Sequence, residues 1–428
     1  MLSNPPSRRD LLKGALALTA ASAGMSSVPY RAHAQGGAMQ GRSRIDGVLR
    51  QATDAREVPG VVAMAATDKG LVYEGAFGVR ELAKGPAMTV DSVFRIASMT
   101  KAVTSVAAMQ LVEQGKLTLE DPVPNIDPAL GSPQVLEGFD AGGAPRLRPA
   151  KRPITLRHLL THTAGFSYEI WDENTVRYVK ATGMPSTITG KVASIRLPLT
   201  FDPGEKWEYG VNTDWVGRLV ESISGQTLDV YFQEKIFGPL GMKDSGYVTS
   251  AEQRGRQAIV HQRGRDGSLA PQPLETPFTP EFWSGGGGLY STARDYLTFL
   301  QMLLNAGSWN AVTILKPETV ALMGKNHTGN IPAGVLKTAV PARSNDVDFF
   351  PGADIRWGLG YMLNVQAGPN GRSAGTVSWG GIFNTYYWID PSRRVTGLIM
   401  TQILPFADAR AVKLYGQYEA AVYESLKA

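Results

Sequence analysis

The sequence predicts an α/β fold in which one discontinuous domain surrounds a mostly helical insertion. Two β-rich runs lie near the N-terminus, a second group of β-rich runs lies in the C-terminal part, and helical patterns fill most of the stretch between them. Strands at both ends of a chain can share one sheet when the middle of the chain folds as an insertion. The composition is that of an ordinary folded protein, because 43% of the 428 residues are hydrophobic and 19% are charged.

The predicted domain boundaries follow from this pattern. Residues 42–120 and 285–428 are assigned to the α/β domain, and residues 121–284 to the mostly helical domain. A length of 428 residues is sufficient for two or three structural units and for a sizeable core.

The first predicted elements are a helix over residues 42–57 and a β-hairpin after it. The helix is indicated by apolar side chains at helical spacing, namely Ile45, Val48, Leu49 and Ala52. The hairpin consists of β-rich runs at 61–67 and 71–78, which are separated by the turn residues Asp68-Lys69-Gly70.

The strongest helical pattern covers residues 97–114 and stops at Gly115. Residues 120–155 are rich in proline and glycine, which favours loops. Helices are predicted again over residues 156–160, 213–224 and 228–237.

The C-terminal part begins with the glycine run 285–288. Ser291 is predicted to cap a helix over residues 292–305, because a serine hydroxyl can accept from free N–H groups at a helix start. A closing helix is predicted from Asp408. Between these two helices, β-rich runs predict strands over residues 357–365, 375–390 and 394–404.

The N-terminus has the pattern of an export signal. Ser7-Arg8-Arg9-Asp10-Leu11-Leu12-Lys13 precedes a modestly apolar run that ends at Ala32-His33-Ala34. This pattern predicts a twin-arginine signal over residues 1–34, with cleavage after Ala34 and a periplasmic or secreted location. No later stretch is long and apolar enough to predict a membrane span.

Charge and composition exclude several classes of function. Outside residues 1–34 the chain carries 39 basic and 37 acidic side chains, a balance that does not indicate a nucleic-acid partner. The absence of cysteine excludes disulfides and thiolate nucleophiles. The sequence has no H-E-x-x-H motif, and its glycine run lacks the G-K-[ST] ending of a phosphate loop, so no metal or other cofactor is expected.

The sharpest chemical signal is Ser98-Met99-Thr100-Lys101 at the start of the long helix. Residues three apart lie on one helix face, so the hydroxyl and the amine can meet. The positive end of the helix dipole disfavours an ammonium group, which predicts that Lys101 loses its proton readily. A serine and a lysine at this spacing are usually a solvated pair, but the apolar residues around them indicate burial.

Two further segments carry candidate residues. Tyr209 follows Pro203-Gly204 and would become a competent base if a cationic Lys101 lowered the pKa of its phenol. Trp379-Gly380-Gly381-Ile382 lies in an apolar strand, where glycines usually mark the close approach of a ligand or another backbone. Taken singly, an ordinary half-buried tyrosine and a β-bulge are adequate explanations of these two segments.

Taken together, Ser98-x-x-Lys101, Tyr209 and Trp379-Gly380-Gly381 resemble the family VIII carboxylesterases. That family shares its fold with class C β-lactamases and D-Ala-D-Ala carboxypeptidases. The resemblance extends over residues 58–397 and implies a β-lactamase and penicillin-binding-protein fold. Such a fold has an antiparallel sheet flanked by helices, with a mostly helical domain that carries Tyr209.

The resemblance also implies roles for individual residues. Ser98 is the expected nucleophile, Lys101 and Tyr209 are its proton-handling partners, and the N–H groups of Ser98 and Ile382 form the oxyanion hole. The implied reaction is hydrolysis of a small-molecule ester through an acyl-enzyme. The expected substrate-binding residues are Trp379, Gly380, Gly381, Phe383 and Trp283, with Phe282 and Tyr386 as weaker candidates.

Two departures from the lactam-processing relatives favour an ester. Those relatives carry Tyr-x-Asn, whereas Val211 stands at the third place here and Asn212 comes one position late. They also carry Lys-Thr-Gly where this chain has Trp379-Gly380-Gly381. Loss of a charge-assisted contact typically costs about 1.5 to 3 kcal/mol, so anionic substrates are expected to bind more weakly than neutral esters.

Several alternatives stay open on the sequence alone. They are a β-lactamase or D-Ala-D-Ala peptidase, an acyltransferase, a short-amide hydrolase and a non-catalytic penicillin-binding-type module. A second serine motif, Gly371-Arg372-Ser373-Ala374-Gly375, matches the nucleophile elbow of α/β-hydrolases. The predicted strand follows this motif instead of preceding it, and the last histidine is His327, so Ser373 is interpreted as a loop residue.

Overall fold

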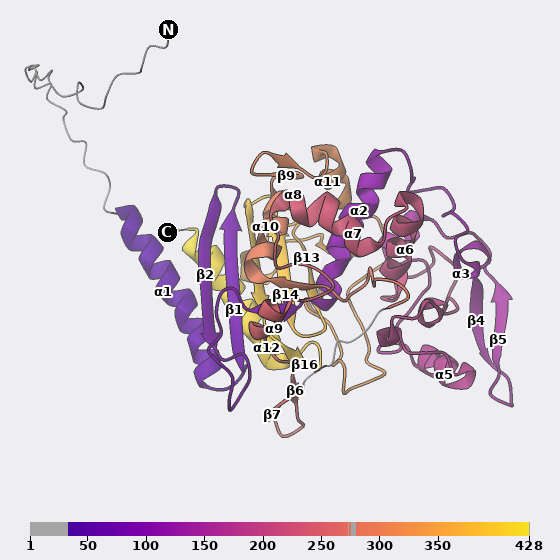
Figure 1. The fold of residues 1–428 in the computed structure, drawn as a ribbon, viewed down its shortest axis with the longest axis horizontal. Coiled ribbons are helices and arrows are strands. Elements are labelled where there is room, and N and C mark those ends of the chain that lie inside the picture. Colours follow the sequence, from indigo (N-terminus) through magenta and orange to yellow (C-terminus); the bar gives the residue numbers. More distant parts are fainter. Residues whose placement is uncertain (1–32, 273, 275–279, 428) are drawn as a thin grey trace, which may run out of the picture.

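The computed structural model describes residues 33–272, 274 and 280–427, with the side chains of residues 33–40 left aside. Its centre is a seven-stranded sheet of order β11-β12-β13-β14-β15-β1-β2, in which every neighbouring pair is antiparallel (Figure 1). The strands are β1 (Gly60–Thr67), β2 (Gly70–Gly78), β11 (Ile355–Trp357), β12 (Met362–Asn364), β13 (Val377–Gly381), β14 (Thr385–Asp390) and β15 (Val395–Met400).

The N-terminal hairpin and the C-terminal strands belong to the same sheet because β1 pairs with β15, with Val62 opposite Met400. The predicted hairpin is confirmed, and an antiparallel sheet flanked by helices is present as expected. The division into domains at residues 42–120, 121–284 and 285–428 stays a prediction.

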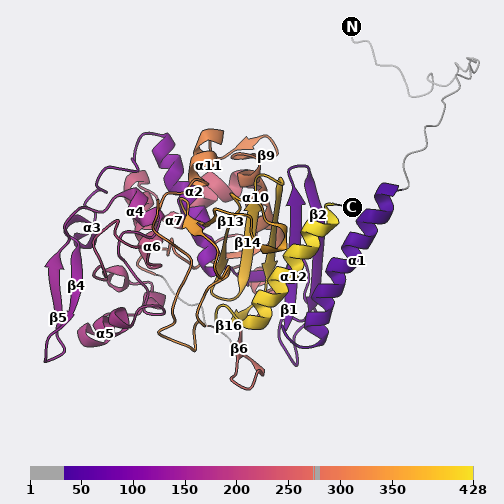
Figure 2. The same ribbon diagram turned by 180° about the vertical axis from the view of Figure 1, so that it is seen from behind.

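Helices cover both faces of the sheet. Helix α10 (Ala293–Leu304) lies on one face, whereas α1 (His33–Asp54) and α12 (Ala409–Ser425) lie on the other (Figures 1 and 2). Neighbouring residues of a strand point to opposite faces. Accordingly, the Tyr387 ring lies 5.5 Å from Tyr296 of α10, and the Trp388 ring lies 5.7 Å from Tyr418 of α12. Strands β14 and β15 are therefore buried along their whole length.

The region between the two parts of the sheet combines helices, short strands and long loops, and the hairpin β4–β5 lies at the end of the molecule opposite α1 (Figure 1). Its helices are α3 (Pro128–Gly131), α4 (Leu156–Leu160), α5 (Glu173–Thr182), α6 (Asn212–Ser224), α7 (Leu228–Phe232), α8 (Gly238–Leu240) and α9 (Ala251–Gly255). The remaining strands are β3 (Val93–Arg95), β4 (Gln134–Phe139), β5 (Pro145–Pro149), β6 (His261–Arg263), β7 (Leu269–Pro271), β8 (Tyr290–Thr292), β9 (Ser308–Trp309), β10 (Val312–Thr313) and β16 (Ile403–Leu404), and one further helix is α11 (Pro317–Met323).

Several predicted elements differ in the structure. The three C-terminal runs are not single strands, because 357–365 spans the end of β11 and β12, 375–390 spans β13 and β14, and 394–404 spans β15 and β16. The stretch 120–155 is not all loop, because it holds the hairpin β4–β5 and the short helix α3. The helix predicted over residues 97–114 begins as a 3-10 turn and becomes the α-helix α2 only at Thr100–Glu113. The cap of α10 is Thr292 and not Ser291, because the Thr292 hydroxyl accepts from the N–H of Asp295, whereas the Ser291 hydroxyl is hydrogen-bonded to that of Ser245.

The predicted export signal lies almost wholly outside the described residues. His33 and Ala34 are the exceptions, and their backbone belongs to α1. Within the described part of the chain, no helix is both long and apolar enough to cross a membrane.

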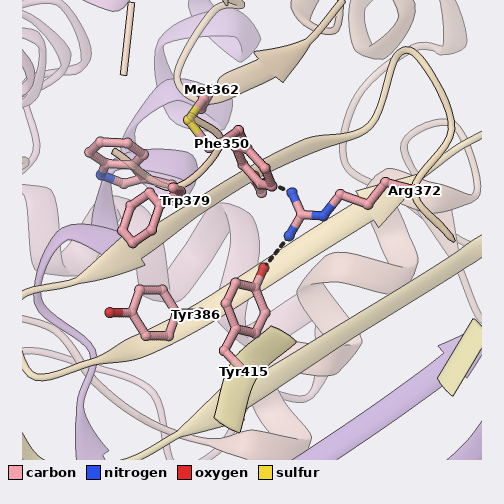
Figure 3. Close-up of a pocket in the computed structure, with 8 residues that line it drawn as sticks. Phe350, Met362, Arg372, Trp379, Tyr386 and Tyr415 are labelled. Atoms are coloured by element: carbon pink, nitrogen blue, oxygen red, sulfur yellow. Dashed lines mark hydrogen bonds between the residues drawn. The ribbon is translucent and has the colours of Figure 1, made fainter. Parts of the chain in front are cut away.

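A buried ion pair joins α12 to the loop before β13. The guanidinium of Arg372 donates to the carboxylate of Glu419, and their side chains are 0% and 1% exposed. Arg372 also donates to the hydroxyls of Tyr415 (2.5 Å) and Ser378 (2.9 Å). Both residues line a small pocket, and Figure 3 shows Arg372 and Tyr415 beside it. This arginine is the second residue of the Gly-x-Ser-x-Gly segment, so the segment has a structural role here.

Arg372→Met is expected to lower the free energy of unfolding by about 3 to 5 kcal/mol, because it leaves the Glu419 carboxylate buried without its partner. The double variant Arg372→Met/Glu419→Leu should recover most of that loss. Chemical denaturation of the three proteins measures both differences. A double variant no more stable than the single one would mean that lost packing, and not the unpaired charge, is the cause.

Candidate functional site

Ser98 lies in a strained turn at the start of α2. The turn covers Ala97–Met99, and Ala97 has a φ of 44°, a left-handed conformation that is rare for residues other than glycine. Tyr296 of α10 donates to the carbonyl of Met99 at 2.9 Å and so connects the turn to this helix. Strained residues held by their surroundings are typical of active sites. Ser98 is half-buried in this strained turn.

Lys101 is 1% exposed, and its amine faces the Ser98 hydroxyl. The Nζ atom donates to the carbonyl of Gly286 at 2.7 Å, to the hydroxyl of Tyr168 at 3.2 Å and to Ser98 Oγ at 3.4 Å. Burial lowers the pKa of Lys101 to about 7, against the opposing effect of the Asp214 carboxylate. A large fraction of this lysine is therefore a neutral amine at neutral pH.

Tyr209 lies against both residues. Its hydroxyl accepts from the Trp379 indole at 2.9 Å and is hydrogen-bonded to Ser98, and the Lys101 amine lies 4.6 Å from its ring centre. The prediction that Lys101 lowers the pKa of this phenol is wrong. Burial raises the pKa of Tyr209, and its hydrogen bonds only reduce the shift. Tyr209 is a neutral phenol at neutral pH because full desolvation disfavours the phenolate.

Close contacts with the backbone fix the position of the segment around Tyr209. A Cβ on Gly210 would lie 2.2 Å from the carbonyl oxygen of Phe166, so only glycine fits there. The buried His162 ring packs 4.6 Å from the Tyr209 ring. The side-chain nitrogen of Asn212 lies 3.0 Å from His162 Nδ1 and donates to the carbonyl of Phe166. Asn212, which comes one position later than the asparagine of Tyr-x-Asn, is therefore engaged by these two residues.

The end of strand β13 lies directly on the Ser98 turn. A Cβ on Gly381 would lie 2.3 Å from the carbonyl oxygen of Ile96, so the predicted close approach of a backbone is present. Ile382, the next residue, packs with Ala97 against one small apolar cluster. This proximity agrees with an oxyanion hole made by the N–H groups of Ser98 and Ile382, which stays a prediction.

The predicted pocket residues separate into two groups. Trp379 belongs to the site, since its ring lies 4.9 Å from Tyr209, and Gly380 and Gly381 lie in the same strand. Trp283 is half-buried and stacks on Tyr247 at 5.1 Å. The other three side chains are buried, with at most 8% of their surface exposed, namely Phe282, Phe383 and Tyr386.

Figure 3 shows Trp379 and Tyr386 beside a small pocket near Arg372. The pocket is lined by Phe349, Phe350, Met362, Arg372, Ser378, Trp379, Tyr386 and Tyr415. Ser98, Lys101 and Tyr209 are not part of this lining. Tyr386 is 2% exposed and belongs to the core, where its hydroxyl donates to Asn384 at 2.7 Å.

Sequence reasoning missed three residues that complete the site: Tyr168, Asp214 and Ser284. Asp214 Oδ1 accepts from the Ser284 hydroxyl at 2.5 Å and from the Gly286 N–H at 3.0 Å, while Oδ2 accepts from Tyr168 at 3.3 Å. An aspartate in the first turn of a helix is an ordinary feature, so its sequence position carried no functional signal. Among the residues that the structure describes, no group of three metal-binding side chains gathers.

Comparison with known proteins agrees with this arrangement. The model of the family described as Beta-lactamase matches residues 45–421. The chain is 32% identical to a monacolin J acid methylbutanoyltransferase from Aspergillus terreus, covering 88% of this chain and 94% of the relative. It is also 32% identical to a lovastatin esterase from Penicillium rubens, covering 84% and 93%.

A solved structure gives the same result for the fold. A mutant of the simvastatin synthase LovD from Aspergillus terreus matches with a TM-score of 0.79 and 30% sequence identity, covering 91% of this chain and 98% of that protein. The expected β-lactamase and penicillin-binding-protein fold is thereby confirmed. The chain belongs to the β-lactamase family and is a serine enzyme of its hydrolytic and acyl-transferring kind.

Proposed function

We propose that this protein hydrolyses short-chain carboxylic esters through an acyl-enzyme on Ser98. The observation that carries the proposal is the meeting of one hydroxyl, one amine and one phenol in a single buried site. The Ser98 hydroxyl lies 3.4 Å from Lys101 Nζ and is hydrogen-bonded to Tyr209. A nucleophile within hydrogen-bond reach of a base is the arrangement that covalent catalysis requires.

Lys101 is the better candidate for the resting base. Its pKa of about 7 leaves a free amine, whereas burial raises the pKa of both Tyr168 and Tyr209. Ser98 attacks the ester carbonyl while its proton passes to the Lys101 amine, either directly or through the Tyr209 hydroxyl. Because the three groups interact closely, they titrate as a coupled unit.

The proton then returns to the leaving alcohol through Tyr209, and the C–O bond to the alcohol breaks. A water molecule attacks the acyl-enzyme by the same proton route and releases the acid and Ser98. The N–H groups of Ser98 and Ile382 stabilise the oxyanion in both steps, at about 3 to 4 kcal/mol for one donor in comparable sites.

Acyl transfer is the second candidate function. One relative is named as a methylbutanoyltransferase and another as an esterase, at the same 32% identity to this chain. Both reactions share the acyl-enzyme and differ only in whether water or another acceptor removes the acyl group. A β-lactamase, peptidase or short-amide hydrolase is less well supported, because Val211 and Trp379 stand where those relatives carry polar groups.

A twin-arginine signal over residues 1–34 would place the protein in the periplasm or outside the cell. The sequence pattern alone supports this proposal. Expression of the full chain in a bacterium, followed by fractionation and N-terminal sequencing, tests it. An unprocessed N-terminus on a cytoplasmic protein would overturn it.

A panel of p-nitrophenyl esters of increasing acyl length, measured beside nitrocefin, tests the substrate class. Short neutral esters are expected to exceed nitrocefin in kcat/KM by roughly 10- to 100-fold, because the missing polar contacts are worth about 1.5 to 3 kcal/mol. Nitrocefin turnover equal to ester turnover would overturn the ester preference. Formation of a new ester in the presence of added alcohol, faster than hydrolysis, would favour the transferase.

A further inference from the structure

Asp214 is a buried carboxylate that the proposed mechanism does not use. It lies in the first turn of α6 and is 4% exposed. Buried carboxylates are expensive to desolvate unless hydrogen bonds or a positive charge compensate them. The partners of Asp214 are all neutral hydrogen-bond donors, namely the Ser284 hydroxyl, the Gly286 N–H and the Tyr168 hydroxyl.

Two of these partners, Gly286 and Tyr168, are also hydrogen-bonded to Lys101. Gly286 donates its backbone N–H to Asp214 Oδ1 at 3.0 Å, and its carbonyl accepts from the Lys101 amine at 2.7 Å. The Tyr168 hydroxyl donates to Asp214 Oδ2 at 3.3 Å and accepts from the same amine at 3.2 Å. Each carboxylate oxygen is therefore connected to Lys101 through one intervening residue, by the hydroxyl of Tyr168 on one side and by the backbone of Gly286 on the other.

The backbone around Gly286 shows how tightly this arrangement is packed. A Cβ on Gly286 would lie 2.6 Å from Asp214 Oδ2 and 2.7 Å from the Tyr168 hydroxyl. A Cβ on the preceding Gly285 would lie 2.4 Å from the carbonyl oxygen of Thr213. The close contacts therefore require glycine at 285 and 286, and at 286 a side chain would meet the carboxylate and the Tyr168 hydroxyl directly.

We propose that Asp214 is a positioning residue, which orients the Lys101 amine through Tyr168 and the backbone of Gly286 and whose negative charge favours the ammonium form of Lys101. This inference rests on the proposed function, because it assigns Lys101 the task of accepting the Ser98 proton. Hydrogen bonds of this kind polarise one another in a low-dielectric site. Asp214 does not touch the substrate in this scheme.

The ionisable groups around Lys101 leave Asp214 as its main electrostatic partner. Tyr209 from the loop before α6 and Tyr168 from the loop before α5 are neutral phenols because burial raises the pKa of each. His162, which follows α4, is a neutral imidazole because burial lowers its pKa well below the ordinary value. The carboxylate of Asp214 raises the pKa of Lys101, opposing the larger effect of burial.

Asp214→Asn removes the negative charge of this residue and keeps nearly the same side-chain shape. The amide oxygen can still accept from Ser284 and Gly286, while the negative charge is lost. In the unmodified enzyme kcat/KM is expected to rise with pH as Lys101 loses its proton, and this rise is the acid limb of the profile. In Asp214→Asn the acid limb is expected to move to lower pH, on the order of one pH unit, because the ammonium form of Lys101 loses its stabilising partner. On the high-pH plateau kcat should fall roughly tenfold, because the amine is less well oriented.

Two variants serve as controls, and fluorophosphonate labelling of Ser98 against pH gives a second readout. Ser284→Ala removes one donor to Asp214 but keeps its charge, so the limb should stay in place. Glu208→Gln removes a buried carboxyl whose pKa burial also raises to about 7. This second control should likewise leave the limb unchanged.

The outcomes distinguish this inference from the proposed function. If the unmodified enzyme forms no acyl-enzyme with esters, the proposed function fails. If it is acylated normally and Asp214→Asn keeps the original limb, the positioning role fails alone. Should Asp214→Asn not fold, as judged by circular dichroism, Tyr168→Phe interrupts one of the two routes. A Tyr168→Phe enzyme with unchanged kcat and unchanged limb would then overturn the inference.

Discussion

Ser98→Ala is expected to abolish turnover of short p-nitrophenyl esters, with a loss of at least about 10⁴-fold in kcat. The variant lacks the oxygen that forms the acyl-enzyme, and the neighbouring Lys101 and Tyr209 cannot replace it. The fold should be unaffected, because Ser98 is half-buried and loses only a hydroxyl. Steady-state ester hydrolysis and mass spectrometry of the acylated protein measure the two consequences.

Ser373→Ala is the matched control, since it removes the serine of the competing Gly-x-Ser-x-Gly segment. Ser373 is also half-buried, and its contact with Asp390 uses its backbone N–H at 2.9 Å. This variant should keep full activity and full labelling. Ester turnover retained by Ser98→Ala and lost by Ser373→Ala would reverse the assignment of the nucleophile.

Lys101→Met is expected to lower kcat/KM by about 10²- to 10⁴-fold, the usual contribution of a general base. Methionine keeps most of the side-chain volume inside the core but cannot take the proton of Ser98. The pH profile gives a second signature. With a pKa of about 7 for Lys101, the neutral fraction rises about tenfold per pH unit below 7 and levels off above it. Activity should therefore rise with pH and reach a plateau.

The acid limb should disappear in Lys101→Met, and the residual rate should be nearly independent of pH in this range. Lys116→Met is a suitable control because that lysine is exposed just beyond the end of α2. A variant that keeps the limb would assign it to another group, of which Glu208 is the clearest example since burial raises the pKa of its carboxyl to about 7.

Local patterns in the sequence were sufficient to predict many of the secondary-structure elements. The hairpin 61–78 was predicted from two β-rich runs and a turn, and the long helix from its apolar spacing. The helix after Asp408 and the β-rich character of the C-terminal runs were predicted in the same way, but the turns that divide each run into two strands were not. The hairpin β4–β5 was missed because its second strand reads Pro145-Arg146-Leu147-Arg148-Pro149, and prolines and exposed charges are atypical of strands.

The sequence by itself determined the chemical types available to this protein: a serine and a lysine three residues apart, a tyrosine after a turn and a glycine-rich strand. Those features are local, so spacing reveals them. Only the tertiary structure decided which groups surround the lysine and which of them carry charge. Asp214, Tyr168 and Gly286 come from separate elements, and their joint effect on Lys101 depends on burial. Desolvation is a property of the whole packed molecule, which no single segment of sequence contains.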